Sequence, residues 1–248
     1  MFNFLRKLRL KNLNGKYFKY ALGEIILVVI GILIALSINN LNENRKQKER
    51  QKQYLIALIS ELKTDLIDLA ERNRIDSIEI LQIETFNSRM SDPRATMDTV
   101  RKIARYEFAP YFDPSNELNR NTMQALSATG EIGQFPKELR DLILKHDSEQ
   151  ISSLKIMDAN VEIFLATMER TALGPSSHPA SQAYGINGKL QDEIWDSMDD
   201  QEIARKVTSR ITSKLIMLKF ISRVRQRLIL NTQLLLFKLE ADFEKYYP

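Results

Sequence analysis

The sequence contains no cysteine, and it has few of the residues that interrupt helices. Without cysteine there is no disulfide framework, no thiolate metal site and no cysteine nucleophile. Only 8 glycines and 7 prolines are spread over 248 residues, which leaves long stretches rich in Leu, Ile, Glu, Lys and Arg. This composition is typical of long helices, and strand-like alternation is scarce. We therefore expect an all-α fold with enough apolar residues to bury a core.

The positive charge is concentrated at the N-terminus. The net charge is +4, yet the first 20 residues contain six cations and no acid, so the rest of the chain has a charge of about −2. These cations are Arg6, Lys7, Arg9, Lys11, Lys16 and Lys19. A basic patch next to an apolar run indicates the flank of a membrane segment more than a nucleic-acid interface.

The apolar run covers residues 20–40 and contains one ionisable carboxylate, Glu24. About 20 helical residues span the hydrocarbon layer of a bilayer, which predicts a single transmembrane helix. Two alternatives are a cleaved signal peptide, for which Ala35-Leu36-Ser37 resembles a cleavage site, and a buried helix of a soluble protein. The run is long for a signal peptide and lacks a polar face, which favours the membrane anchor.

Three residues of this run are candidates for helix packing. Glu24, Gly31 and Ala35 fall near one side of a helix, and Gly31 and Ala35 form a pair of small residues that permits close approach of another helix. The simpler interpretation of Glu24 is that its carboxylate reaches the headgroups or pairs with Lys16, Lys19 or Tyr20. Asn39 and Asn40 are expected at the far interface, where their amides contact water.

The distribution of cations gives the orientation. Six Lys and Arg precede the run and five follow it within residues 45–52, which favours a cytoplasmic N-terminus by a small margin. Residues 41–248 would then be periplasmic, and the protein would lie in the inner membrane of the cell envelope. Residues 1–19 are expected to form a short basic amphipathic helix on the lipid surface, followed by a turn at Asn14-Gly15, or else a disordered tail.

The segment GKYFKYALGEIILVVIGILIALSINNLNENRK closely resembles the N-terminal signature of DUF6090, an uncharacterised family of single-pass membrane proteins from Bacteroidota. Gly23, Glu24, Gly31, Asn39, Asn40 and Glu43 match that signature. Ser37 stands where glutamine is usual, and Leu41 stands where the family has an interfacial tryptophan. ELNRNTMQALSATGEIGQFPKELRDLILKHD resembles a later helix, turn and helix of the family more loosely. The resemblance implies a membrane anchor and a helical domain, and it implies no activity.

Residues 41–248 are predicted to form one antiparallel bundle of long helices. Apolar residues at spacings of three and four extend the first helix to about Met90, where Ser91-Asp92-Pro93 stops it. Further helices are expected over 96–108, 117–129, 136–172, around Trp195 and from Asp199 or Asp200 to about Lys245. A loop at 109–116, with Ser115 or Asn116 as helix cap, and a linker at 174–188 separate them.

Nothing in this domain predicts catalysis. His146 lies three residues before Glu149 on a helix, and the expected role is that of a surface histidine rather than a metal ligand. His178 lies in the linker, and no catalytic or phosphate-binding motif is present. We therefore expect no enzyme, no cofactor and no metal.

Two sets of cations recur at spacings of four on the last helix: Lys206, Arg210 and Lys214, then Lys219, Arg223 and Arg227. The acidic residues Glu61, Asp65 and Asp68 offer them partners within the chain, so we expect a solvated or salt-bridged face and no nucleic-acid binding. The leading hypothesis is a membrane-anchored helical scaffold that contacts the bilayer and a protein partner or a second copy of itself. The alternative is a ligand-sensing extracytoplasmic domain that signals through a partner.

Overall fold

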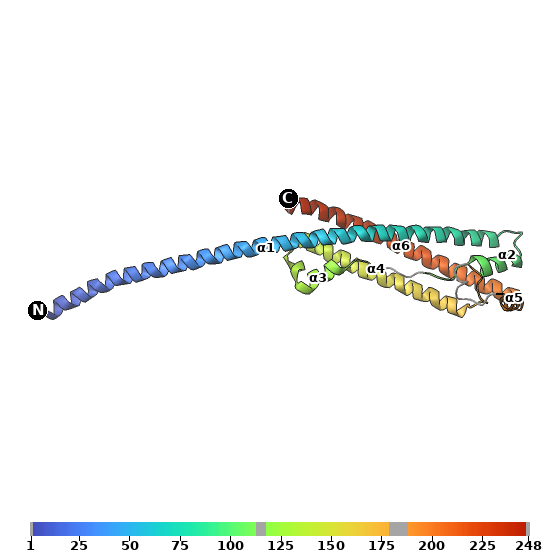
Figure 1. The fold of residues 1–248 in the computed structure, drawn as a ribbon, viewed down its shortest axis with the longest axis horizontal. Helices are drawn as coiled ribbons and strands as arrows, with labels where there is room; N and C mark the ends of the chain where they lie inside the picture. The colour runs from blue at the N-terminus through green and yellow to red at the C-terminus, as the bar shows by residue number, and fades with distance from the viewer. Residues whose placement is uncertain (1, 113–117, 179–187, 247–248) are drawn as a thin grey trace. The chain divides into compact units, whose positions relative to one another are not determined.

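The computed structural model describes residues 2–112, 118–178 and 188–246, and within these ranges every regular element is helical. Figure 1 shows the helices in chain order. They are α1 (Phe2–Met90), α2 (Met97–Lys102), the π-helix η1 (Ile103–Glu107), α3 (Asn121–Thr129), the 3₁₀ helix η2 (Glu131–Gln134), α4 (Lys137–Arg170), α5 (Lys189–Asp196) and α6 (Asp200–Tyr246). The predicted all-α fold, with a long apolar N-terminal helix followed by a helical bundle, is confirmed.

Helix α1 is continuous over 89 residues. The turn predicted at Asn14-Gly15 is wrong, because α1 passes through both residues. A glycine inside a helix costs about 1 kcal/mol relative to alanine, and the strong helix formers on either side offset that cost. The predicted end at Met90 is confirmed. There the side chain of Asp92 accepts a hydrogen bond from the backbone N–H of Arg94 at 2.8 Å, in a turn that contains Pro93.

The chain divides into two compact units, Met1–Gln53 and Tyr54–Pro248. In the first unit, every side chain from Phe18 to Lys46 is exposed. This part of α1 contains a window of 18 residues with a mean hydropathy of 2.7, none of it buried. The helix is therefore long and apolar enough to cross a membrane.

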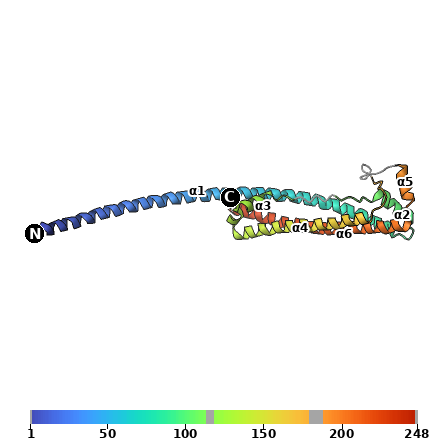
Figure 2. The same cartoon turned by 90° about the horizontal axis from the view of Figure 1, so that it is seen from below.

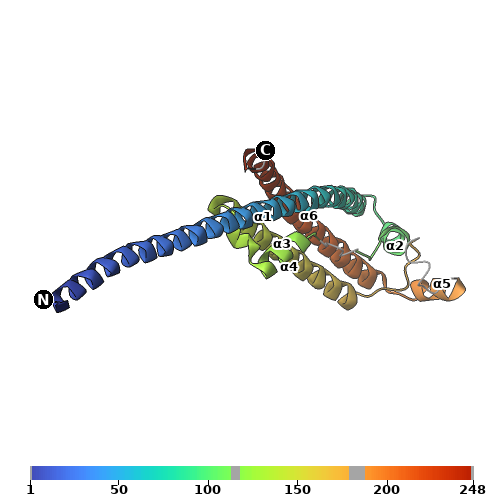
Figure 3. The same cartoon turned by 60° about the vertical axis from the view of Figure 1, so that its left-hand side comes forward.

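The second unit is a bundle of the C-terminal part of α1 with α4 and α6. Figures 2 and 3 show α4 and α6 side by side along its length. Buried positions on α6 recur at spacings of three and four residues, which places them on one face. They are Val207, Ile211, Lys214, Leu218, Ile221, Arg225, Leu228, Thr232, Leu235 and Leu239. The core is thus mostly aliphatic, with a polar residue at three of these positions.

The directions of the helices follow from their contacts. Helix α6 runs antiparallel to α1, because Lys63 pairs with Glu240 at one end and Glu84 with Lys219 further along. It also runs antiparallel to α4, in which His146 contacts Thr232 and Met168 contacts Arg210. Helices α1 and α4 therefore run in the same direction.

The segment between η1 and α3 makes this arrangement possible. Its backbone carbonyls at Ala109 and Tyr111 accept hydrogen bonds from Lys214, and Asn119 contacts Asp65. Asp65 lies 14 residues, or two heptads, before Glu79, the partner of Lys214. The segment therefore returns along the bundle, so that α4 starts near the end of the bundle at which α1 enters it. The predicted caps at Ser115 and Asn116 lie outside the described residues, and Arg120 precedes α3.

Two helix boundaries have clear local causes. Gly130 ends α3 with φ of 71°, a left-handed conformation that glycine adopts without a steric penalty, as the sequence predicts. Asp199 caps α6, because its carboxylate accepts a hydrogen bond from the backbone N–H of Glu202 at 2.9 Å. Pro136 lies just before α4 rather than at its first position.

Candidate functional site

The residues predicted for helix packing in the first unit lie on the exposed part of α1. Glu24, Gly31 and Ala35 share a side of the helix, and a methyl group added at Gly31 would meet no atom within 4 Å. Asn39, Asn40 and Lys19 are also exposed. The remaining flank cations lie on the first turns of α1, where the structure describes the backbone alone. The roles assigned to these residues stay predictions.

The bundle contains a buried layer of charges. Arg225 of α6 forms an ion pair with Asp76 of α1, and their side chains are only 2% and 7% exposed. One turn along α1, Glu79 pairs with Lys214, whose side chain is 1% exposed. The Lys214 Nζ also donates to the carbonyls of Ala109 at 2.7 Å and Tyr111 at 2.8 Å. All three donors of the ammonium group therefore have acceptors.

Burial changes the ionisation of two groups in this layer. Desolvation raises the pKa of Asp76, and the charge of Arg225 opposes that shift. Desolvation likewise lowers the pKa of Lys214, opposed by Glu79. Both charged forms are thus disfavoured by the core and retained by their partners. We name these four residues, Asp76, Glu79, Lys214 and Arg225, the ionic layer.

A second polar cluster lies nearer the start of α4. Asp65 accepts hydrogen bonds from the backbone and the side chain of Asn119, at 2.9 and 2.7 Å, and from Gln150 at 3.2 Å. Desolvation raises the pKa of the Asp65 carboxyl despite these donors. The cluster fixes the returning segment between α1 and α4.

His146 belongs to the same region and corrects a prediction. It is 6% exposed, so the expected surface position is wrong. Its Nε2 lies 2.9 Å from the hydroxyl of Thr232, which itself donates to the carbonyl of Leu228. Because that hydroxyl has one hydrogen, Nε2 of His146 is the donor. His146 therefore occupies a core position on α4. Its sequence neighbours, Lys145 and Asp147, are charged, so the sequence predicts a surface position instead.

Protonation of His146 is expected to destabilise the bundle. Desolvation lowers its pKa below 6.5, against the opposing charges of Glu149 and Asp147. The unfolded chain therefore binds a proton more readily, and the free energy of unfolding falls as pH drops below 6.5, by less than about 1.4 kcal/mol per pH unit. Chemical denaturation at pH 7 and pH 5 measures this. The His146→Gln variant should lose that component, and an unchanged pH dependence in the variant would contradict the assignment.

The cations of α6 do not use the partners predicted for them. Lys206 pairs with Glu202, and Lys219 pairs with Glu84, while Glu61 instead accepts a hydrogen bond from the backbone of Thr122. The expectation that Glu61, Asp65 and Asp68 complement this helix is wrong, because the antiparallel alignment brings residues 76–84 of α1 to the cations. The salt-bridged character of the face is confirmed for three of the six cations, Lys206, Lys214 and Lys219.

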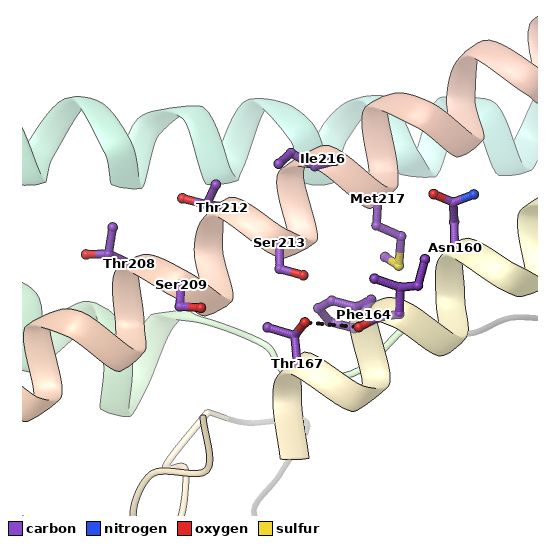
Figure 4. A pocket seen from close by; sticks show the side chains of 10 residues that line it. Asn160, Phe164, Thr167, Thr208, Ser209, Thr212, Ser213, Ile216 and Met217 are labelled. Carbon is purple, nitrogen blue, oxygen red and sulfur yellow. Dashed lines mark hydrogen bonds between the residues drawn. The ribbon is translucent and has the colours of Figure 1, made fainter. Parts of the chain in front are cut away.

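Two grooves open between α4 and α6 on the outside of the bundle. The first has a volume of about 430 Å³, and Figure 4 shows the hydroxyl side chains of both helices that line it. Ile163 of α4 and Ile216 of α6 also line it. The second has a volume of about 400 Å³ and lies between Leu142 of α4 and Leu234 and Phe237 of α6.

The described side chains show no metal site: no group of three or more His, Asp or Glu among them is placed to hold an ion.

The far end of the bundle is closed by Arg101, which donates to the carbonyls of Trp195 and Met198. Trp195 is buried there, and its indole N–H donates to the carbonyl of Pro175 at 2.8 Å. These contacts join α2 to α5, and sequence periodicity gave no signal for them.

The fold and the site define an all-α protein with a helical bundle and a buried ionic layer. Its helix α1 has an exposed apolar run in its N-terminal part and belongs to the bundle in its C-terminal part. Comparison with known families adds one match. The model of a family of unknown function, DUF6090, matches residues 24–107, which confirms the resemblance over that segment. The looser resemblance of residues 117–147 lies outside the match. No curated protein and no solved structure matches the chain.

Proposed function

We propose that the protein is a membrane-anchored helical scaffold that presents its bundle to a protein partner in the cell envelope. One observation supports this above the others: the exposed apolar run and the first bundle helix are parts of a single uninterrupted helix. Such a run is stable in lipid and unfavourable in water. The role requires neither catalysis nor a cofactor, and coiled-coil packing of the long helices would give the scaffold its length.

The distribution of cations supports an inner-membrane location with a cytoplasmic N-terminus and a periplasmic bundle. Self-association through Gly31 and Ala35 of the membrane segment is compatible with this role, since a small-residue pair lets two helices approach closely.

Fractionation with a topology reporter tests the proposal. A phosphatase that is active only outside the cytoplasm is fused after Pro248, and membranes are washed with alkaline carbonate. We expect the fusion to stay in the pellet and the phosphatase to be active. Release into the supernatant would refute the anchor, and an inactive phosphatase in the pellet, with activity from a matched cytoplasmic reporter, would reverse the topology.

The ionic layer favours ligand sensing as the second candidate function. A buried set of charges between helices is sensitive to the helix arrangement, so a ligand that bound in one of the grooves and shifted α6 would change the stability of the ionic layer. The membrane helix would then pass the change to a partner. Ligand-induced stabilisation of the purified chain against heat would support sensing over a passive scaffold.

A further inference from the structure

We propose that the outer surface of α4 and α6, which includes both grooves and the stretch between them, binds an amphipathic helix of a partner protein, with apolar residues at both ends of the contact and acidic residues at its centre. We call this surface the outer groove. This inference rests on the proposed scaffold function and adds the surface and the chemistry of the partner. Helix-in-groove binding uses anchors spaced by about a turn or two, and the groove presents side chains with that spacing.

Exposed apolar residues follow a seven-residue repeat on both helices. On α6, Ile216, Leu230 and Phe237 are 63%, 60% and 70% exposed, and Arg223 occupies the remaining position of the repeat. On α4, Leu142, Ile156 and Ile163 are partly exposed at the same interval, with Glu149 between them. Side chains seven apart lie on one face of a helix, so these two stripes are separate from the buried face.

The two stripes contribute residues to both grooves of this surface. Ile163 and Ile216 line the first groove, which forms its first end, and Leu142 and Phe237 line the second groove, which forms its second end. Between Ile216 and Phe237, α6 advances by 21 residues, which is about 32 Å of helix. Hydroxyl side chains such as Ser213 and Thr212 line the first end, and their small size permits close approach of another helix. An apolar seam of this length fits a partner helix of about six turns.

The centre of the seam is positive. Arg223 and Arg227 are exposed, and neither forms an ion pair with another residue in the described part of the chain. Their neighbours Lys214 and Lys219 both pair with carboxylates of α1. Glu149 is the acid closest along the seam, and it already accepts a hydrogen bond from Asn231 at 2.8 Å. The two guanidinium groups are therefore available for bidentate contacts with carboxylates.

The positive charge of Arg223 and Arg227 determines which kind of helix can bind to the outer groove. Two copies anchored in one membrane would lie parallel and would bring Arg223 and Arg227 level with the same cations of the second copy. Like charges across an interface oppose association, whereas carboxylates at the centre of a partner helix would complement them. An amphipathic helix with central acidic residues is the occupant that satisfies both the apolar ends and the cationic centre.

Peptide binding to the full-length chain in detergent tests this. Two synthetic helical peptides of about 21 residues have leucines at both ends and differ only at two central positions, glutamate in one and lysine in the other. We expect the glutamate peptide to bind at least about tenfold more tightly in fluorescence anisotropy, since close charge pairs contribute at least about 1.5 kcal/mol. Empty micelles give the background partition of each peptide.

Three variants locate the contact. Arg223→Glu combined with Arg227→Glu should reverse the preference between the two peptides. Phe237→Asp should weaken both peptides by about tenfold, the loss of one buried aromatic anchor. The matched control is Ile67→Asp on α1, whose side chain is equally exposed at 70%, and it should leave both affinities unchanged. Helical content and melting temperature of each variant establish that it is folded.

Equal affinity for the two peptides, or an equal effect of Ile67→Asp and Phe237→Asp, would overturn the proposal. A dimer in detergent that Phe237→Asp dissociates would assign the groove to a second copy instead and would also overturn it. The result does not depend on where the chain resides in the cell. Failure of peptide binding is therefore distinguishable from failure of the membrane anchor, which fractionation measures separately.

Discussion

The Arg225→Met variant is expected to lose about 3–5 kcal/mol of unfolding free energy, the usual cost of removing one partner from a buried ion pair. Asp76 would remain in the core with its carboxylate unpaired. Burial already raises the pKa of that carboxyl with Arg225 present, and without the guanidinium its pKa would rise further. Urea unfolding of the full-length chain in detergent, followed by circular dichroism, measures the loss.

The pH dependence of the same variant has a defined sign. A carboxyl whose pKa is raised in the folded state stabilises the fold below its unfolded pKa, near 3.8, and that stability is lost as pH rises towards the folded pKa. The deficit of Arg225→Met relative to wild type should therefore be small at pH 4 and larger at pH 7. A deficit independent of pH would show that Asp76 is not the group left unpaired.

The double variant Asp76→Leu, Arg225→Met separates charge burial from packing. Apolar residues of similar volume replace the pair, so stability should return to within about 1 kcal/mol of wild type or exceed it. Removing the exposed pair with Lys219→Ala provides the control, because Lys219 and Glu84 are about half exposed and such pairs contribute less than about 1 kcal/mol. A double variant as unstable as the single one would refute the ionic explanation.

The ionic layer also restricts the alignment of α1 with α6. Apolar residues at heptad spacing would still pack after a slip of seven residues, since leucine would again face leucine or isoleucine. The same slip would separate Asp76 from Arg225 and Glu79 from Lys214 and leave four charges without partners. The layer therefore favours one register of the antiparallel pair, at a cost in the stability of the core.

The elements that could be predicted from the sequence are those with local causes. The helix over the apolar run, the stop near Pro93 and the left-handed Gly130 each follow from a few adjacent residues, and each is confirmed. The turn at Asn14-Gly15 failed because a local signal was weaker than the helix around it. The start of α3 is also later than predicted. The sequence predicts a helix from residue 117, whereas α3 begins at Asn121, directly after Arg120.

The ionic layer could not be predicted in the same way. Asp76 and Arg225 are 149 residues apart in sequence, and only the antiparallel alignment brings them together. In the sequence Asp76 interrupts the apolar stripe of α1, and a charge at a core position is costly. A signal was nevertheless present: Lys214, Arg225 and Thr232 continue the three-and-four spacing of the aliphatic residues on α6. Polar residues in register with an apolar stripe indicate buried partners.

The sequence pattern also could not predict which cations of α6 border the outer groove and which pair with α1. Lys219, Arg223 and Arg227 were interpreted together as one cationic face of a helix. The structure separates them, because Lys219 faces Glu84 of α1 while Arg223 belongs to the stripe that borders the outer groove. Periodicity places these residues on a surface, and only the position of α1 distinguishes the paired cation, Lys219, from the two that have no carboxylate partner in the described part of the chain.

Two arginines in the apolar run should remove the protein from the membrane. Ile30 and Leu33 lie near the middle of the run and are exposed on α1. An arginine at the centre of a membrane helix costs about 2.5–3.5 kcal/mol, so Ile30→Arg with Leu33→Arg would reduce insertion by a factor on the order of 10⁴. The amount of chain that resists an alkaline carbonate wash measures this.

Asn39→Arg with Asn40→Arg is the matched control for that experiment. It adds the same two charges at the predicted interface, where arginine side chains reach the headgroups and cost little. We expect the control to stay in the membrane pellet as wild type does. If both double variants stay in the pellet, the run does not act as a span; if both are released, residues 39 and 40 lie within the hydrocarbon and the interface is farther from the centre of the run than Asn40. The difference between the two variants thus tests the anchor and the depth of its far end together, because only the position of the charges has changed.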